Sequence, residues 1–582
     1  SDVCSSDLNI MPELKTVWGE NLNPDSILPE YPRPQLARNS YVNLNGRWDY
    51  AITESDAEPE HWDGEILVPF SPEAPLSGVN RTLLPGQTLW YRREIAEMRR
   101  ERQRLLLHFG AIDQEAKIYV NGKLAGVHLG GYTAFTVELT EFLTDGPSVL
   151  TVAVRDGTDT NEYCRGKQKT KRGGIWYTPQ SGIWQTVWME WVPQSYITGL
   201  RITPDAANGC VRVVVEAEEN RACYLHFAGR RVGAFTNREC VLRVEVPELW
   251  TPEHPKLYEF SAELGEDRVE SYFALRDIGI GRDAAGHPCL TLNGKPVFHT
   301  GVLDQGYWPD GRYTAPSNEA LIWDIQTMKN LGFNMLRKHI KLEPMRWYYH
   351  CDRLGMLVWQ DMPNGGGKYD LMTISAPLIT RRHKKDNDYK RFARTDAAGR
   401  AEYYAGLDEM VRQLYNCPSV VMWVPFNEGW GQFDAAEAVR RIRALDPTRT
   451  IDHASGWHDQ GAGDVQSLHV YFYQYRFRPD KRGRAVVLSE FGGYNLPLAG
   501  HTWNDANFGY RGYKTPEALE AAYRKLYETQ IIPAKEKGLA ACVYTQLSDV
   551  EDEVNGLVTY DRRVVKLPVS VPFALNAQLK RE

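Results

Sequence analysis

The stretch of sequence that decides the fold is Val420-Val421-Met422-Trp423-Val424-Pro425-Phe426-Asn427-Glu428-Gly429. A second stretch repeats its pattern: Ala485-Val486-Val487-Leu488-Ser489-Glu490-Phe491-Gly492-Gly493. Both are short, continuous apolar runs that are rich in β-branched residues and broken by glycine. This pattern is typical of strands buried on both faces of a parallel sheet. Each run closes on a glutamate, and barrel enzymes keep their reacting groups at this carboxyl end of their strands.

The sequence around these runs alternates strands with amphipathic helices, and it predicts a C-terminal (β/α)8 TIM barrel over residues 281–582. Along the chain, the run that ends at Glu428 is the fourth expected strand and the run that ends at Glu490 is the seventh. Ser317 is the predicted N-cap of the first helix. The other expected strands cover residues 297–303, 333–336, 356–359, 451–453, 466–471 and 539–547. The expected helices cover residues 317–331, 343–354, 402–414, 435–445 and 516–537.

The residues before the barrel carry no long helical pattern. Short strand-like runs and the hairpin signal Asn121-Gly122 predict a jelly-roll-like β-sandwich over residues 11–193. Residues 194–280 continue as short alternating strands, and this length fits an immunoglobulin-like β-sandwich. We expect residues 1–10 to be a tag or a remnant. The chain is therefore expected to be a multidomain protein that combines β domains with an α/β domain.

Charge and hydropathy exclude several kinds of partner. The 582 residues include 68 basic and 75 acidic side chains, a net charge of −7, so nothing points to nucleic acid. No apolar run approaches the ~18 residues of a membrane span. The N-terminus lacks the basic region and apolar core of a signal peptide, so we expect a cytoplasmic protein, or a periplasmic one if a signal peptide had been removed. The oligomeric state stays open, and a homo-oligomer is compatible with the sequence.

Cysteine usage argues against a metal or disulfide framework. The nine cysteines are scattered, odd in number and without a Cys-x-x-Cys pair, so free buried thiols are expected. No other spacing demands a metal, and we expect no cofactor. Aromatic residues make up 11% of the chain, which suits the binding of sugars through stacking on flat rings. The same excess suits ordinary all-β cores.

Two carboxylates on different barrel strands predict a glycosidase. A retaining glycosidase needs a nucleophile and an acid/base roughly 5–5.5 Å apart, and strands four and seven face each other across a barrel. The acid needs a raised pKa, which an apolar environment and the charge of Glu490 could give to Glu428. The cation expected to keep Glu490 ionised is Arg337, at the end of the second strand. The structural alternative is that each glutamate is a solvated loop residue or a charge at a helix N-terminus, and that Arg337 lies at the surface.

Several motifs resemble glycoside hydrolase family 2, the family that includes β-galactosidases, β-glucuronidases and β-mannosidases. Asn427-Glu428 and Ser489-Glu490-Phe491-Gly492 are similar to its acid/base and nucleophile motifs. The runs Leu89-Trp90-Tyr91-Arg92-Arg93 and Val120-Asn121-Gly122-Lys123 resemble its N-terminal sugar-binding sandwich. The runs Asn334-Met335-Leu336-Arg337-Lys338-His339 and Cys351-Asp352-Arg353-Leu354-Gly355-Met356 resemble its barrel signature. The resemblance covers nearly the whole chain.

The resemblance implies a role for each matching residue. It makes Glu428 the acid/base and Glu490 the nucleophile, with Asn427 binding the sugar 2-hydroxyl. It also implies that Tyr471 hydrogen-bonds the nucleophile and that Arg337 holds it ionised. The further residues that would line the sugar pocket, each of which could instead be structural, are His339, Asp361, Trp457 and His469. The last strand reads Val543-Tyr544-Thr545-Gln546 where many relatives have tryptophan, so Tyr544 or Gln546 would shape the sugar subsite there.

The sugar at the cleaved end is inferred from a missing lysine. β-Glucuronidases of the family carry an Asn-x-Lys motif after the last strand, and the matching stretch here is Glu553-Val554-Asn555-Gly556. Because Glu553 would repel a carboxylate, we expect a retaining exo-β-glycosidase that resembles a β-galactosidase and acts on an oligosaccharide or glycoside. The alternatives are a β-glucuronidase or arabinopyranosidase of the same family, and a non-catalytic carbohydrate-binding protein. A basic run at residues 381–385, in the long loop 361–398, could replace the lysine.

Overall fold

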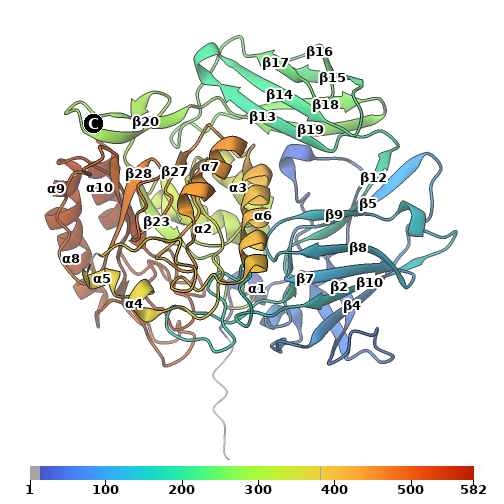
Figure 1. The fold of residues 1–582 in the computed structure, drawn as a ribbon, viewed down its shortest axis with the longest axis horizontal. Coiled ribbons are helices and arrows are strands. Elements are labelled where there is room, and N and C mark those ends of the chain that lie inside the picture. The colour runs from blue at the N-terminus through green and yellow to red at the C-terminus, as the bar shows by residue number, and fades with distance from the viewer. Residues whose placement is uncertain (1–13, 381, 582) are drawn as a thin grey trace, which may run out of the picture.

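The computed structural model describes residues 14–380 and 382–581, and it arranges them as two β-rich regions beside one α/β barrel (Figure 1). The expected remnant at residues 1–10 lies outside the described residues. The N-terminal sandwich, in blue, packs beside the barrel, in yellow to red, and the green middle region lies across both. No described helix has the length and apolar character that a membrane crossing requires.

The N-terminal region is a sandwich of two antiparallel sheets. The sheets interdigitate around one apolar cluster that includes Trp48, Leu107 and Ile118. Strand β7 (Glu115–Val120) alternates exposed and buried side chains because one face meets this core and the other meets solvent. The first sheet has the order β1 (Tyr41–Asn43), β12 (Val187–Pro193), β5 (Gln103–Phe109), β9 (Phe135–Glu138). The second has the order β3 (Gly64–Val68), β2 (Gly46–Thr53), β4 (Thr88–Ile95), β10 (Ser148–Arg155), β7 (Glu115–Val120), β8 (Lys123–Leu129). A third, small sheet pairs β6 (Ile112–Asp113) with β11 (Gly182–Ile183).

The middle region is a smaller sandwich with its own apolar cluster around Val213, Leu225 and Phe273. Its three-stranded sheet has the order β13 (Gly199–Asp205), β14 (Cys210–Glu216), β17 (Glu239–Arg243). Its four-stranded sheet has the order β16 (Arg230–Phe235), β15 (Ala222–Phe227), β18 (Tyr258–Leu264), β19 (Asp267–Phe273). A small antiparallel sheet then leads into the barrel: β20 (Ile278–Arg282), β21 (Pro288–Leu292), β22 (Lys295–Pro296).

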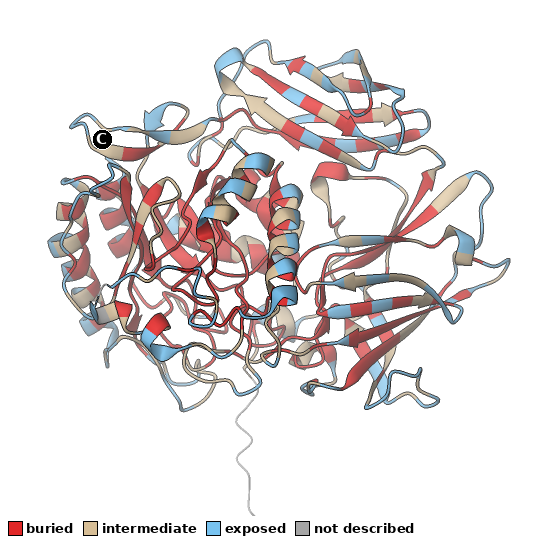
Figure 2. Ribbon diagram, viewed as in Figure 1, coloured by how far each residue is buried: buried red, intermediate tan, exposed pale blue. Residues whose placement is uncertain are grey.

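The C-terminal region is an eight-stranded parallel barrel, which confirms the predicted (β/α)8 architecture. Its order begins with β27 (Thr450–Ile451), β26 (Val420–Val424), β25 (Leu357–Asp361), β24 (Met335–Lys338). It continues with β23 (His299–Asp304), β32 (Leu539–Thr545), β29 (Ala485–Gly492), β28 (Val465–Val470). Every residue of β26 and β29 is buried, as the continuous apolar runs predict, and Figure 2 shows the barrel strands in red.

Helices surround the barrel strands (Figure 1). The side chain of Ser317 accepts a hydrogen bond from the backbone of Ala320, so it is the predicted N-cap. Helix α7 (Ala435–Leu445) covers the predicted residues 435–445. The long helix expected before the last strand is broken by a π-helical turn at Tyr527–Ile531. The longer helices are α2 (Asn318–Asn330), α3 (Met345–Leu354), α6 (Ala397–Leu414), α7 (Ala435–Leu445), α8 (Pro516–Leu526) and α10 (Ser570–Leu579). The one-turn helices are α1 (Val17–Glu20), α4 (Leu371–Ile374), α5 (Pro377–Thr380) and α9 (Ile532–Lys535).

Candidate active site

Hydrogen bonds to its backbone hold Glu428 in place. It stands four residues past the end of β26, in a left-handed conformation with φ of 50°. Its N–H donates to the carbonyl of Ser455 over 2.9 Å, and its carbonyl accepts from the indole of Trp457 over 2.8 Å. A left-handed backbone costs free energy in a residue other than glycine, and such conformations persist where surrounding contacts fix them. The loop after β27 therefore fixes where the Glu428 carboxyl points.

Glu490 lies inside β29 and is only 4% exposed. One of its oxygens accepts a hydrogen bond from the Arg337 guanidinium over 3.2 Å, and the other accepts from the Tyr471 hydroxyl over 2.5 Å. Both donors favour the ionised carboxylate. The barrel thus supplies the cation and the hydroxyl that a nucleophilic carboxylate needs.

The two glutamates meet across the barrel mouth, with His469 between them. A carboxylate oxygen of Glu428, a ring nitrogen of His469 and a carboxylate oxygen of Glu490 all lie within 4.8 Å of one another. The His469 Nδ1 atom is 2.7 Å from Glu428 and 3.5 Å from Glu490. These three groups could also hold a metal ion. The separation of the carboxyls fits the roughly 5–5.5 Å of a retaining glycosidase and is shorter than the roughly 6.5–9.5 Å of an inverting one.

The environment gives the two carboxyls different protonation tendencies. Burial raises the pKa of Glu428 to about 8, although the charges of Lys167 and Arg337 lower it. Burial also raises the pKa of Glu490, and the charge of an ionised Glu428 would add to that rise, whereas Arg337 and the Tyr471 hydroxyl oppose it. At neutral pH Glu428 is therefore mostly protonated and can act as an acid, whereas the direct contacts of Glu490 favour its anion. Burial lowers the pKa of His469 to about 4, so its ring is neutral.

Arg337 is the centre of the polar network. Its side chain is fully buried, and it forms two hydrogen bonds with Asp361 and one with Asn427 besides its contact with Glu490. Asp361 also contacts His339 Nδ1 at 2.7 Å. Asp361 therefore orients two other predicted site residues, and its oxygens are occupied in doing so.

The structure brings nine of the ten predicted site residues together and places Tyr544 elsewhere. The Tyr544 ring lies against Phe491 and Tyr523, on the side of β32 that faces the helices. The next residue, Thr545, contacts the Tyr471 hydroxyl at 2.9 Å. Neighbouring residues of a strand point to opposite faces, so the last strand turns Thr545, and not Tyr544, toward the site.

Three buried residues near Glu428 were not among the predicted site residues. Lys167 and Tyr177 come from the connection between β10 and β11, in the N-terminal sandwich, and Glu553 follows the last barrel strand. The charges of Lys167 and Glu553 both reach Glu428 and act on its pKa in opposite directions. No periodic pattern marks these positions. Glu553 was identified from the sequence only as a source of repulsion.

The basic run in the loop after β25 lies against neighbouring loops. The Lys384 ammonium bonds the carbonyl of Met372 and the hydroxyl of Thr373. The His383 ring contacts the backbone N–H of Asp459, and Lys385 is exposed. Arg381 lies outside the described residues. His383 and Lys384 therefore have partners other than the two glutamates.

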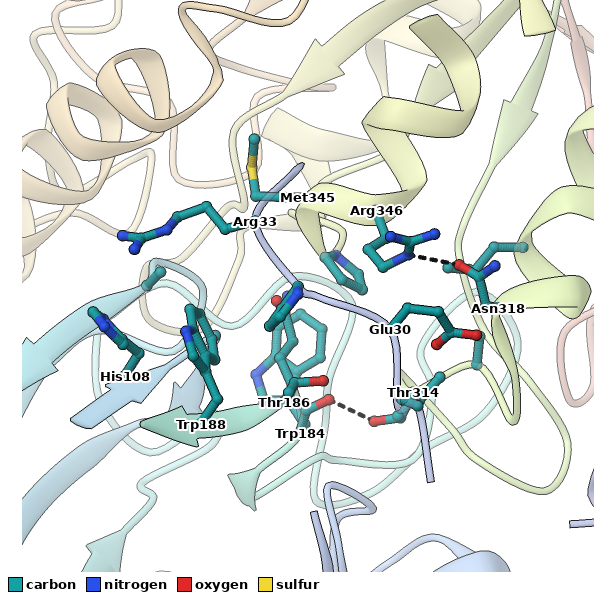
Figure 3. Close-up of a pocket in the computed structure, with 18 of the residues that line it drawn as sticks. Glu30, Arg33, His108, Trp184, Thr186, Trp188, Thr314, Asn318, Met345 and Arg346 are labelled. Carbon is teal, nitrogen blue, oxygen red and sulfur yellow. Dashed lines mark hydrogen bonds between the residues drawn. The ribbon is translucent and has the colours of Figure 1, made fainter. Parts of the chain in front are cut away.

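A separate cavity of about 300 Å³ lies between the N-terminal sandwich and helix α3 (Figure 3). Trp184 and Trp188 line it from the sandwich side, and Asn318 and Arg346 line it from the barrel side. The indole of Trp188 is stacked on His108, so this ring already has a partner on one face. None of the predicted site residues lines this cavity.

A parallel barrel with paired carboxylates at the carboxyl ends of two strands is the arrangement of a glycoside hydrolase. The chain belongs to glycosyl hydrolases family 2. Its residues 75–190 match the family's sugar binding domain, residues 205–276 match the middle domain described as glycosyl hydrolases family 2, and residues 286–485 match the TIM barrel domain.

Relatives with two different names match the chain. It is 24% identical to a β-glucuronidase from Streptococcus agalactiae over 538 residues, 81% of this chain and 86% of that protein. It is also 24% identical to a β-galactosidase from Aeromonas hydrophila over 494 residues, 74% of this chain and 45% of that protein. The chain spans about half the length of several curated relatives that it matches. A solved β-D-glucuronidase from Dictyoglomus thermophilum has the same fold, with a TM-score of 0.72, 19% identity and coverage of 95% of this chain and 99% of that one.

Proposed function

We propose that the chain is a retaining exo-β-glycosidase that releases a terminal β-linked sugar by double displacement. The observation that carries this proposal is the approach of Glu428 and Glu490 within 4.8 Å, with only one of them bonded to a cation. That asymmetry separates an acid from a nucleophile. The contacts of Arg337 and Tyr471 would be superfluous in a protein that only binds carbohydrate.

Two steps follow from this geometry. In the first, a Glu490 oxygen attacks the anomeric carbon while Glu428 gives its proton to the departing glycosidic oxygen, leaving a covalent glycosyl-enzyme. In the second, ionised Glu428 takes a proton from water, the water oxygen attacks the anomeric carbon, and the bond to Glu490 breaks. Two inversions restore the β configuration, and Glu428 ends protonated, as it began.

Asn427 supplies a contact for the sugar 2-hydroxyl in this proposal. It is 1% exposed, its oxygen accepts from Arg337, and its side-chain nitrogen has no hydrogen-bond partner among the residues that the structure describes. A buried amide donor without a partner is unfavourable, so a ligand oxygen that accepts from it stabilises the complex. A contact to the 2-hydroxyl that strengthens in the transition state contributes directly to the rate.

The preferred sugar in our proposal is a neutral one, galactose first. No lysine occupies the position at which the family's β-glucuronidases place one, and the charge of Glu553 reaches Glu428. A β-glucuronide is the second candidate, because the relative from Streptococcus agalactiae is named a β-glucuronidase. An arabinopyranoside would fit the same reasoning as galactose, because it also lacks a carboxylate.

Trapping of the intermediate tests this function. The protein should react with 2-deoxy-2-fluoro-β-galactosyl fluoride, and mass spectrometry of the digested protein should find the label on Glu490. The Glu490→Gln variant is the matched control and should remain unlabelled. In a parallel assay, proton NMR of the first product should show the β anomer. Label on another residue, or an α anomer formed first, would contradict the mechanism.

A further inference from the structure

We propose that Lys167 and Glu553 form a pair of separated opposite charges that binds two hydroxyl groups of a neutral sugar at the cleaved end. In this arrangement the N-terminal sandwich supplies one wall of the barrel's active site. The inference rests on the proposed function and names the residues that would select its substrate class.

The backbone before Lys167 is bonded to the barrel, and the residues after it are bonded to the N-terminal sandwich. The N–H groups of Arg165 and Gly166 both donate to the carbonyl of Asn364, over 2.9 and 3.0 Å. The side chain of Gln168 donates to Asp113, and the N–H of Tyr177 donates to the carbonyl of Lys167 over 3.0 Å. The segment therefore joins the barrel loop after β25 to the sandwich, and it gives the Lys167 side chain a fixed origin.

The Lys167 ammonium has been taken out of water without a counter-ion. The residue is 4% exposed, and no carboxylate oxygen among the described residues lies within 4.0 Å of the ammonium. The ammonium lies near two aromatic rings, with centroids at 5.4 Å for Tyr177 and 5.7 Å for Trp430. Cation–π contacts offset only part of the cost of burying a charge. Oxygen atoms of a bound sugar would supply the acceptors that the protein does not.

Glu553 is the anionic counterpart. It is 1% exposed, it accepts hydrogen bonds from the Tyr177 hydroxyl and from the side chain of Asn555, and no described cation lies within 4.0 Å of it. Each carboxylate oxygen can accept more than one hydrogen bond, so capacity for a ligand hydroxyl remains. Tyr177 stands between the two charges, with its ring near the ammonium and its hydroxyl on the carboxylate. It keeps them from closing into an ion pair.

Both charges act on the acid/base. The pKa of Glu428 is lowered by Lys167 and raised by Glu553, so both groups lie close enough to affect the residue at the scissile bond. Trp430, whose ring lies near the Lys167 ammonium, follows Glu428 by two residues. The pair is thus adjacent to the sugar that Glu428 and Glu490 enclose.

Charge balance selects a neutral sugar. A hydroxyl group both accepts and donates, so one hydroxyl can accept from Lys167 while another donates to Glu553. A carboxylate would gain from Lys167 and lose to Glu553, and it would add a third buried charge to a pair that sums to zero. A cationic group on the substrate would be attracted by Glu553 and repelled by Lys167.

Deoxygenated substrates test the pair through double-mutant cycles. We would measure kcat/KM for p-nitrophenyl β-galactoside and its 3-, 4- and 6-deoxy analogues with the wild-type protein, Lys167→Met and Glu553→Gln. Each variant should lose about 10- to 100-fold on the parent galactoside. In the wild type, removing a hydroxyl that contacts either charge should lower kcat/KM relative to the parent galactoside. For one deoxy position this loss should nearly vanish in Lys167→Met, and for a different position it should nearly vanish in Glu553→Gln. Lys169→Met is the matched control, because Lys169 lies two residues along the same segment over the Trp176 ring, and it should behave as wild type.

The outcomes separate this inference from the proposed function. Suppose that Glu490 is labelled and galactosides are cleaved, but each deoxy analogue loses the same factor in kcat/KM in both variants as in the wild type. The paired-charge inference is then wrong and the glycosidase assignment stands. If no glycoside labels Glu490, the proposed function itself is wrong. A wild-type preference for the glucuronide that Lys167→Met abolishes would also overturn the inference, because Lys167 would then bind a carboxylate. Thermal melting of each variant confirms that the losses occur in folded protein.

Discussion

The Arg337 guanidinium donates to the side-chain oxygen of Asn427 over 2.8 Å, and this one bond decides which way the Asn427 amide faces. Arginine has donors and no acceptor, so the amide oxygen must point toward it. The amide nitrogen is then left without a partner within residues 14–380 and 382–581. The residue that pairs with the nucleophile thereby also prepares a donor for the substrate.

Removing that donor should be costly only when the substrate has a 2-hydroxyl. For Asn427→Ala we expect kcat/KM for p-nitrophenyl β-galactoside to fall about 10- to 100-fold, because a buried hydrogen bond in the transition state is lost. On the 2-deoxy galactoside the variant and the wild type should agree within about threefold. An equal loss on both substrates would mean that Asn427 acts through the fold.

Loss of the nucleophile should abolish turnover and spare the fold. For Glu490→Gln we expect kcat to fall about 10⁴-fold or more, because no covalent intermediate can form. Circular dichroism should stay unchanged, since glutamine keeps the shape of the side chain, its one amide oxygen can accept from Arg337, and its amide N–H can donate to the Tyr471 hydroxyl oxygen. Residual turnover near the wild-type rate would assign the nucleophile to another group.

Loss of the acid/base should depend on the leaving group. For Glu428→Ala we expect poor leaving groups such as alkyl glycosides to suffer most, because they need the proton. Activated aryl glycosides should keep a fast first step, and added azide should restore turnover by attacking the glycosyl-enzyme. Stopped-flow kinetics with a 2,4-dinitrophenyl and an alkyl galactoside measures both effects, and equal damage to the two substrates would contradict the role.

Activity should fall at the pH at which Glu428 loses its proton. Burial raises the pKa of Glu428 to about 8, so the acid form is present below this pH and disappears above it. We therefore expect kcat/KM for an alkyl galactoside to fall as the pH rises through about 8. In Glu428→Ala, with an activated aryl substrate, this basic limb should be absent. A basic limb that survives the substitution would belong to a different group.

The barrel and its two glutamates were predictable because their signal is local. A fully buried parallel strand needs a continuous β-branched run, and the runs that end at Glu428 and Glu490 have that composition. The length of helix α7 followed in the same way from its apolar spacing. The fifth strand was expected over residues 451–453 and pairs only at Thr450–Ile451, because boundaries depend on the neighbouring strand.

The rest of the site depends on contacts between residues that are distant in the sequence. The segment that carries Lys167 is attached to the barrel by the N–H groups of Arg165 and Gly166, which donate to the carbonyl of Asn364, and no pattern within residues 164–177 reveals these bonds. Tyr544 and Thr545 differ by one position, and a shift of one residue along a strand exchanges the two faces. Sequence composition identifies the last strand without deciding which of these two faces the sugar.

The attachment of residues 164–177 to the loop after β25 has a consequence for modular exchange. If Lys167 and Tyr177 form a wall of the site, the barrel cut away from its sandwich keeps both glutamates and loses part of its substrate pocket. A chimaera that joins this barrel to a sandwich from a relative would inherit that relative's selectivity at one side of the sugar. Substrate selectivity would then be determined at the interface between the two domains, and substitutions in either domain could change it.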